Sequence, residues 1–252
     1  MKVGLTTYSL SKAMKAGDIN ILQAIEWIAD NGGEHVEISP SGCFVLAGND
    51  SLIEAIVKKA KETNLEISSY TIKANFLHEN DAAYKAEIER AIREVDVANK
   101  LGAKLMRHDV CNWHIDNPSE QRFQKDLPKV AHACRTIADY AKQFEITTSV
   151  ENHGLLFQHS HRIHRLIEAV DRDNFRTTLD IANFACVDEN CISAVTQNAK
   201  LASLVHAKDF FMRSKTGPNP GQGWIRTLDG NWLRGLPPWF TSRNGECKKV
   251  LG

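Results

Sequence analysis

Three short segments of this chain decide its fold: residues 149–154 read SVENHG, residues 178–184 read TLDIANF, and residues 205–210 read VHAKDF. Each begins in an apolar, β-rich run and passes directly into carboxylate, amide or imidazole side chains. Such runs are typical of short strands that are covered on both faces. The polar groups therefore mark the ends of three successive strands, which are predicted at 146–151, 175–180 and 202–208.

The same pattern continues toward the N-terminus. Further strands are predicted at 2–8, 35–39, 65–73 and 103–108. Apolar residues at helical spacing predict helices at 19–30, 51–63, 81–101, 119–144, 160–170 and 188–199, with a break allowed near Pro128. Seven strand–helix alternations predict a parallel sheet with right-handed crossovers. So many units favour a closed barrel over an open sheet, and the predicted fold class is α/β, a (β/α)8 TIM barrel.

In a barrel of this kind, active sites lie at the C-terminal ends of the strands. Glu151, Asp180 and His206 stand at or near three consecutive strand ends. Alone, an Asp after a strand is usually a turn residue, and a His on an apolar strand is usually a core side chain. Together they offer two carboxylates and one imidazole, which suit Mn²⁺, Mg²⁺, Co²⁺ or Zn²⁺. We therefore predict that these three residues bind a divalent metal ion.

The three segments resemble the sugar phosphate isomerase/epimerase family of xylose isomerase-like TIM barrels, which is related to endonuclease IV. The opening run VGLTTYSL and the run HVEISP at residues 35–40 fit as well, and the resemblance covers roughly residues 1–235. It implies one divalent cation held by Glu, Asp, His and a second Glu on strand eight. Position by position, the first three of these are Glu151, Asp180 and His206.

The fourth ligand does not carry over. After residue 235 the chain reads LPPWFTSRNGECKKVLG, in which no apolar run ends in a carboxylate. Glu246 is the only acidic residue of this stretch and is a weak replacement ligand. We expect a barrel domain over 1–235, an atypical tail over 236–252, and an eighth strand that is missing or degenerate.

The origin of this tail stays open between a frameshift, a truncation and a natural variant. In each case strands one and seven would lack the partner that closes the barrel. A tail segment, another subunit or an open edge must then occupy the gap. A homodimer is one expectation from this incomplete edge.

The resemblance implies an isomerase or epimerase that removes a proton from the carbon next to a carbonyl and forms an enediolate. A divalent cation would polarise that carbonyl, and Glu151 would be one member of the acid/base pair as well as a metal ligand. Substrate hydroxyls need polar partners around the metal, and the candidates are His153, Asn183, Lys208 and Arg213, followed by His108 and Glu37. The family often has His where this chain has Asn183, so a close epimerase assignment is weakened.

Three other functions are weighed against this one. A lyase or dehydratase of the same superfamily would act on inositol-derived or shikimate-type substrates. A non-catalytic sugar- or metal-binding protein would explain the missing strand-eight Glu. A DNA repair enzyme like endonuclease IV is disfavoured, because Asn183 replaces a needed His and the overall charge is neutral.

Composition limits the partners and the compartment. The chain has 252 residues with 31 basic and 31 acidic side chains, so it carries no overall charge that would attract nucleic acid or an anionic membrane. No apolar run is long enough to span a bilayer, and no leader segment is recognisable. The six cysteines form no C-x-x-C pair. We expect a cytoplasmic protein with free thiols. The family resemblance implies a small carbohydrate as its substrate.

Overall fold

The computed structural model describes residues 2–113 and 115–236. The predicted tail over 236–252 lies outside the described residues except for Leu236, and Glu246 lies outside them entirely. None of the helices in the described part of the chain is long and apolar enough to cross a membrane.

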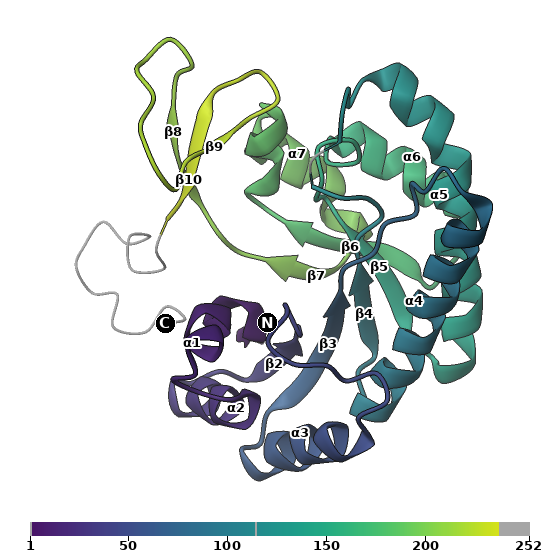
Figure 1. Cartoon of the computed structure of the whole chain (residues 1–252), viewed down its shortest axis with the longest axis vertical. Helices are drawn as coiled ribbons and strands as arrows, with labels where there is room; N and C mark the ends of the chain where they lie inside the picture. The colour runs from purple at the N-terminus through teal and green to yellow at the C-terminus, as the bar shows by residue number, and fades with distance from the viewer. Residues whose placement is uncertain (1, 114, 237–252) are drawn as a thin grey trace.

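One sheet of seven strands forms the centre of the molecule (Figure 1). Its strands follow chain order: β1 (Gly4–Thr6), β2 (His35–Ile38), β3 (Glu66–Ile72), β4 (Leu105–His108), β5 (Thr147–Glu151), β6 (Phe175–Asp180) and β7 (Ala202–His206). Each strand pairs in parallel with the next. Among the described residues, β1 and β7 are the two ends of the sheet and do not pair with each other. The predicted α/β barrel with a missing eighth strand is confirmed.

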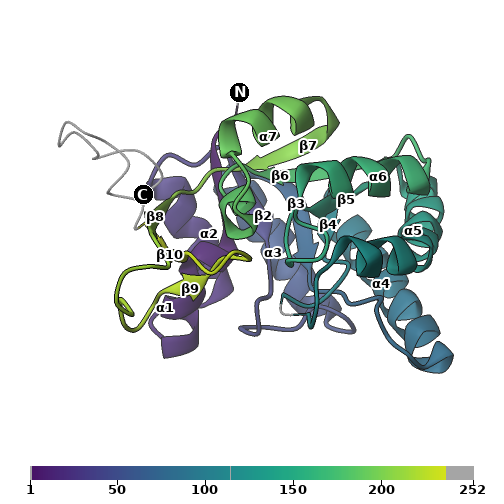
Figure 2. The same ribbon diagram turned by 90° about the horizontal axis from the view of Figure 1, so that it is seen from above.

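Helices cover the outer face of this sheet, and from the second helix onward each contacts the next in chain order (Figures 1 and 2). They are α1 (Ser11–Ala16), α2 (Ile21–Asp30), α3 (Asp50–Glu62), α4 (Asp81–Leu101), α5 (Glu120–Ala141), α6 (Ser160–Val170) and α7 (Cys191–Asn198). The buried residues of α2 to α6 join the outward residues of the strands in one apolar core, which includes Ile25, Ile56, Tyr70, Phe123 and Phe175. Ala194 of α7 packs with Leu179 and Phe184 in a separate small cluster. Burial of these stripes against the sheet is what stabilises the helices, more than their intrinsic propensity.

Side-chain caps set where several helices begin. Asn20 accepts hydrogen bonds from the Leu22 and Gln23 amides, and Gln23 reaches back to the Asn20 amide, which completes a capping box. Asn190 accepts from the Ser193 amide, so α7 begins at Cys191 and not at the predicted residue 188. A left-handed backbone at Asp188 separates α7 from a preceding 3₁₀ turn, η3 (Asn183–Val187).

The break that the sequence allowed near Pro128 does not occur. α5 runs unbroken through Pro128. The hydrogen bond that proline cannot make would go to the carbonyl of Gln124, and both residues lie on the exposed face where water can satisfy that carbonyl. Buried residues before and after the proline, Phe123 and Val130, keep both halves of the helix packed on the core.

After β7 the chain forms a second, smaller sheet of three antiparallel strands in the order β8 (Phe210–Arg213), β10 (Trp232–Gly235) and β9 (Ile225–Arg226). It lies beside α7, outside the curled parallel sheet (Figure 1). Leu233 is fully buried against Ala185 and Cys186 of η3. This small sheet is not among the elements predicted from the sequence, whose last predicted strand is 202–208.

Candidate functional site

Alternation along the parallel strands selects which side chains face the inside of the curled sheet. Successive residues of a strand point to opposite faces. Tyr70 on β3 bonds outward to Glu94 of α4, while Arg107 on β4 contacts Glu151 on β5. Asp180 on β6 stands opposite His206 on β7 in the strand register. The inner face at the C-terminal strand ends therefore carries the charged residues of the site.

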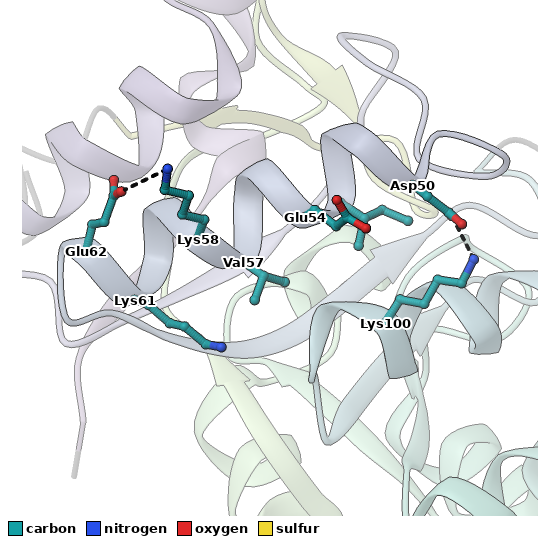
Figure 3. Close-up of a pocket in the computed structure, with 8 residues that line it drawn as sticks. Asp50, Glu54, Val57, Lys58, Lys61, Glu62 and Lys100 are labelled. Carbon is teal, nitrogen blue, oxygen red and sulfur yellow. Dashed lines mark hydrogen bonds and ion pairs between the residues drawn. The ribbon is translucent and has the colours of Figure 1, made fainter.

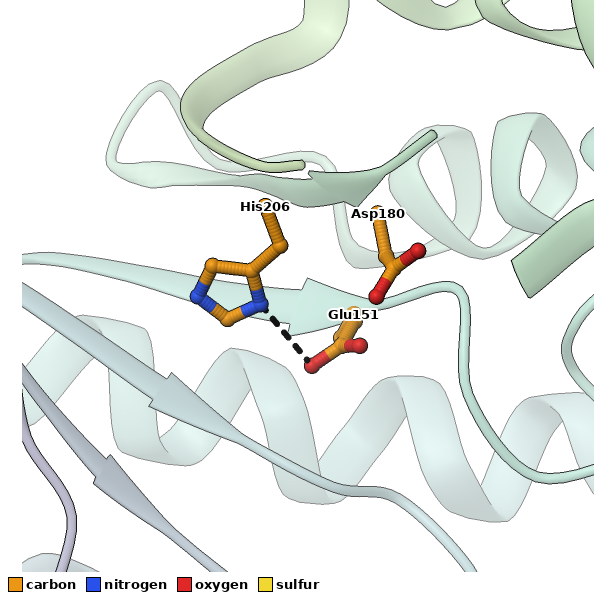
Figure 4. A group of neighbouring side chains, drawn as sticks. All are labelled: Glu151, Asp180 and His206. Atoms are coloured by element: carbon orange, nitrogen blue, oxygen red, sulfur yellow. Dashed lines mark ion pairs between the residues drawn. The ribbon is translucent and has the colours of Figure 1, made fainter. Parts of the chain in front are cut away.

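Glu151, Asp180 and His206 converge at this inner face (Figure 4). Each offers one ligand atom, and these atoms all lie within 4.8 Å of one another. Glu151 and Asp180 are buried, and His206 is half-buried. Two carboxylate oxygens and one imidazole nitrogen in this arrangement fit a hard or borderline divalent cation. Within residues 2–113 and 115–236, these three are the single group of acidic, His or Cys side chains arranged in this way.

Asn152 and the turn after β6 fix Asp180 in place. The side-chain amide of Asn152 donates to the Asp180 carbonyl at 2.9 Å, and its oxygen accepts from the Asp180 amide at 2.9 Å. Asp180 Oδ1 accepts from the amides of Ala182 and Asn183, each at 3.0 Å. Oδ1 is occupied by the backbone, and Oδ2 faces Lys208 Nζ at 2.9 Å, so a cation bound through Oδ2 would have to displace or share that ammonium group.

Burial and neighbouring charges act in opposite directions on the two carboxyl groups. Burial alone would raise the pKa of Glu151, but Arg107 and His206 outweigh burial and lower that pKa. Burial raises the pKa of Asp180, while Lys208 opposes the rise and Glu151 adds to it. Glu151 is thus held as a carboxylate in an enclosed position, which is the protonation state that a metal ligand requires.

His206 connects two carboxylates through its two ring nitrogens. Its Nδ1 lies 3.6 Å from Glu151 Oε2, and its Nε2 lies 3.2 Å from Glu37 Oε2. Burial would lower the pKa of His206, but Glu37 and Glu151 raise it to about 10. A bound divalent cation would replace the proton at the nitrogen that faces Glu151, since metal ligation requires the unprotonated nitrogen.

Four of the residues expected to bind substrate lie at or beside this group. Asn183 Nδ2 donates to Glu151 Oε1 at 2.8 Å, and Lys208 Nζ lies 2.9 Å from Asp180 Oδ2. His153 Nδ1 is 3.0 Å from Asp109 Oδ1, and its ring packs on Trp113. Glu37 is buried behind His206. Of these four, Lys208 has the most exposed side chain, at 41%.

The other two candidates, His108 and Arg213, lie away from this group. His108 follows inward-facing Arg107 on β4, so it points to the outer face, where it is fully buried near the rings of Phe76 and Phe175. Arg213 ends β8 and lies over the ring of Trp224 within the region of the small sheet. Among the described residues, neither forms a hydrogen bond or an ion pair with Glu151, Asp180 or His206.

Arg107 is the functional residue that the sequence analysis missed. Its Nη2 lies 2.8 Å from Glu151 Oε2 and 2.6 Å from Asp109 Oδ1, with all three side chains buried. The signal was present in the sequence, because alternation on β4 allows only one of Arg107 and His108 to face inward. Alternation does not say which of the two it is, and the register of β4 with its neighbouring strands places Arg107 inside.

A hollow of about 650 Å³ lies elsewhere, on the helical surface of α3 near the end of α4 (Figure 3). Lysine and acidic side chains line it, among them Lys58, Lys61, Lys100 and Asp50. It contains none of the residues predicted for the site and opens on the outer layer of the fold, so it does not define the functional site.

Comparison with known proteins agrees with this architecture. A family model described as a xylose isomerase-like TIM barrel matches residues 25–234. A search of curated protein sequences found no match.

Solved structures of several enzymes share the fold. D-psicose 3-epimerase from Clostridium cellulolyticum H10, solved with D-tagatose, is 16% identical, with a TM-score of 0.66 over 82% of this chain and 72% of that one. The probable 3-DHS dehydratase AsbF from Bacillus anthracis is 17% identical, with a TM-score of 0.65 over 83% and 74%. A xylose isomerase-like TIM barrel protein from Mycobacterium smegmatis in complex with magnesium is 14% identical, with a TM-score of 0.64 over 94% and 81%.

Proposed function

The chain belongs to the family of xylose isomerase-like TIM barrels, and from that membership we propose that it is a divalent-metal-dependent isomerase or epimerase of a sugar or sugar phosphate. The observation that carries the proposal is the convergence of Glu151, Asp180 and His206, whose ligand atoms lie within 4.8 Å of one another. The structural neighbours with named activities include epimerases and a dehydratase. They support the reaction class and leave the sugar open.

Glu151, Asp180 and His206 would hold the cation. When bound, a divalent cation supplies a Lewis acid that polarises the substrate carbonyl and favours loss of a proton from the adjacent carbon. Two observations indicate that this site fits a divalent cation with its substrate. The first is the set of ligand atoms on Glu151, Asp180 and His206. The second is Asn183, whose buried Oδ1 has no hydrogen-bond partner in the described part of the chain.

Glu151 is the residue that takes the proton. It is a buried carboxylate, and Arg107 and Asn183 fix its two oxygens at 2.8 Å each. That support holds the carboxylate in one orientation toward the interior, which reduces the reorganisation needed during proton transfer. Proton removal leaves negative charge on the substrate oxygen, and the ammonium group of Lys208 beside Asp180 stabilises such charge.

Return of the proton distinguishes two reactions of the same site. An epimerase needs a second acid on the opposite side of the substrate, and no eighth barrel strand supplies one within residues 2–113 and 115–236. Lys208 lies beside Asp180, and His153 lies beside Asp109, and both side chains are titratable. Protonation of a leaving hydroxyl by either group would give a dehydratase, which is the alternative that the similarity to the dehydratase structure favours.

Deuterium exchange tests the proposal without assuming the product. The Mn²⁺-loaded protein is incubated in D₂O with a panel of ketoses and their phosphates, and the recovered sugars are analysed by mass spectrometry and NMR. We expect one deuteron to enter next to the carbonyl, and we expect Glu151→Gln to abolish that exchange. Glu94→Gln, which changes a carboxylate on the outer face, is the matched control and should leave the exchange unchanged.

The products then separate the alternatives. Exchange with a change in configuration supports an epimerase or isomerase, and loss of water supports the dehydratase. Mn²⁺ binding with no exchange on any sugar would favour a non-catalytic binding protein. Absence of Mn²⁺ binding would overturn the metal-dependent proposal itself.

A further inference from the structure

We propose that Glu37 is a positioning residue that orients the His206 imidazole for cation binding. The sequence suggested that Glu37 contacts the substrate, but its side chain is only 4% exposed. This inference rests on the proposed metal site and assigns an additional residue to it. It concerns the orientation of one ligand and leaves the choice of sugar untouched.

The two nitrogens of His206 face different carboxylates. Nδ1 lies 3.6 Å from Glu151 Oε2, while Nε2 lies 3.2 Å from Glu37 Oε2. A histidine that ligates through Nδ1 carries its remaining proton on Nε2, and Glu37 is placed to accept that N–H. The hydrogen bond therefore selects the tautomer whose free electron pair points to Glu151 and Asp180. Because the imidazole ring lies between Glu37 and Glu151, Glu37 fixes the orientation of His206 from the side opposite the cation.

Glu37 is itself held in place from β1. Thr6 of β1 and Glu37 of β2 are direct partners in the strand register, so β2 is paired with β1 at the position of Glu37. Through His206, the Glu37 carboxylate then links β2 with β7. These contacts run across the side of the curled sheet where β1 and β7 do not pair with each other among the described residues.

His206 needs this support more than the other two ligands do. Glu151 and Asp180 lie on strands that are paired on both sides, and Asn152 ties the ends of those strands together. His206 ends β7, which pairs only with β6 in the described part of the chain, and its side chain is 23% exposed. Without Glu37, the imidazole on this edge strand would be free to rotate and to take up either tautomer.

Titration with Mn²⁺ tests the role of Glu37 independently of catalysis. Free Mn²⁺ is measured by electron paramagnetic resonance for the wild type, Glu37→Ala and Glu37→Gln. Loss of an outer-sphere partner typically weakens metal binding by about 10- to 100-fold, and we expect Glu37→Ala to fall in that range. Glu37→Gln keeps an oxygen that can accept the Nε2 proton, so it should recover most of the affinity. Glu94→Gln, a carboxylate variant on the outer face, should bind as the wild type does.

Urea unfolding in the presence of EDTA, with the same variants, separates positioning from a purely structural role. Wild-type Mn²⁺ affinity in a destabilised but folded Glu37→Ala protein would overturn the proposal and leave Glu37 a structural link. Failure of Glu37→Gln to improve on Glu37→Ala would also overturn it. Absence of Mn²⁺ binding in the wild type would instead remove the metal site, and the proposed function would fail together with this inference.

Discussion

His108 is enclosed between aromatic rings on the outer face of β4. It is fully buried, its Nδ1 lies 2.9 Å from the Asp109 carbonyl oxygen, and its Nε2 has no hydrogen-bond partner in the described part of the chain. Burial lowers the pKa of His108 from 6.5 to about 4, although the contact with the Asp109 carbonyl opposes that change. The folded protein therefore keeps this imidazole neutral at a pH where the unfolded chain protonates it.

The free energy of unfolding should fall as the pH drops from 6.5 toward 4. In that range the unfolded state binds a proton at His108 and the folded state does not, so acid favours unfolding. Above pH 6.5, protonation of His108 in the unfolded chain no longer lowers the free energy of unfolding. By pH 5 it is expected to lower that free energy by about 2 kcal/mol. Urea unfolding in EDTA at pH 7 and pH 5 measures it. His108→Gln removes the titrating group, so its free energy of unfolding should change by about 2 kcal/mol less between pH 7 and pH 5. An equal change in the wild type and in His108→Gln would show that His108 does not cause the loss.

Neighbouring residues on β4 show how far the site follows from sequence. The segments that end in Glu151, Asp180 and His206 identified the converging group because each residue closes a recognisable strand. Arg107 and His108 follow one another at the end of such a strand, and sequence position alone does not say which faces inward. The structure places Arg107 inside, bonded to Glu151, and His108 outside. The strand register, which depends on contacts between distant segments, decides this.

At the level of elements, Asp188 fastens the small antiparallel sheet to the barrel. Its Oδ1 accepts from the Thr227 hydroxyl and the Asn231 side-chain amide, each at 2.8 Å, and its Oδ2 accepts from the Asp229 amide at 2.7 Å. Few other polar contacts cross this junction; one is the bond from the Leu228 amide to the Cys186 carbonyl at 2.9 Å. Hydrogen bonds to a charged acceptor contribute about 1.5–3 kcal/mol each.

Replacing Asp188 with Ala should release this small sheet and leave the parallel sheet folded. The variant loses three such hydrogen bonds, and water replaces them in part. The free energy of opening the small sheet should therefore fall by about 3 kcal/mol, which corresponds to roughly 150-fold faster amide exchange. Hydrogen exchange followed by mass spectrometry should show this increase for β8 and β10 and little change for β3 and β4. Asp188→Asn keeps an oxygen acceptor, and asparagine tolerates the left-handed backbone at this position. The exchange rates of β8 and β10 in this variant should therefore fall between those of the wild type and those of Asp188→Ala. Equal acceleration in β3 and β4 would show that the two sheets open together.

The elements that the sequence predicts poorly are those that depend on docking. The parallel strands and their helices carry strong local signals, such as the capping box at Asn20 and the apolar runs before Glu151 and Asp180. β9 has only two residues and is exposed, so it has no periodicity to recognise. This region is ordered because Leu233 packs on η3 and Asp188 binds the turn, and neither contact is visible along the sequence.

At the level of the whole molecule, the proposed cation site would join the less supported end of the curled sheet to its better supported strands. Its three ligands come from β5, β6 and β7, and β7 has a strand partner on one side only among the described residues. A bound cation would therefore join β7 to two strands that are paired on both sides. Any motion that separates β7 from β6 must break at least one ligand bond, whereas the small sheet supplies no ligand and can open without disturbing the site.

Mn²⁺ should consequently protect β7 from hydrogen exchange without protecting the small sheet. A ligand that binds only the closed state adds about 2.7 kcal/mol at a concentration 100 times its Kd, which slows exchange from openings that lose the ligand by about 100-fold. We expect this slowing in the peptide that contains β7, no comparable slowing in β8 and β10, and reversal by EDTA. Asp180→Asn should abolish the effect, because it removes a ligand from the middle strand. Protection of β8 and β10 equal to that of β7 would show that the two sheets open as one unit, and no protection in either would exclude a cation shared by β5, β6 and β7.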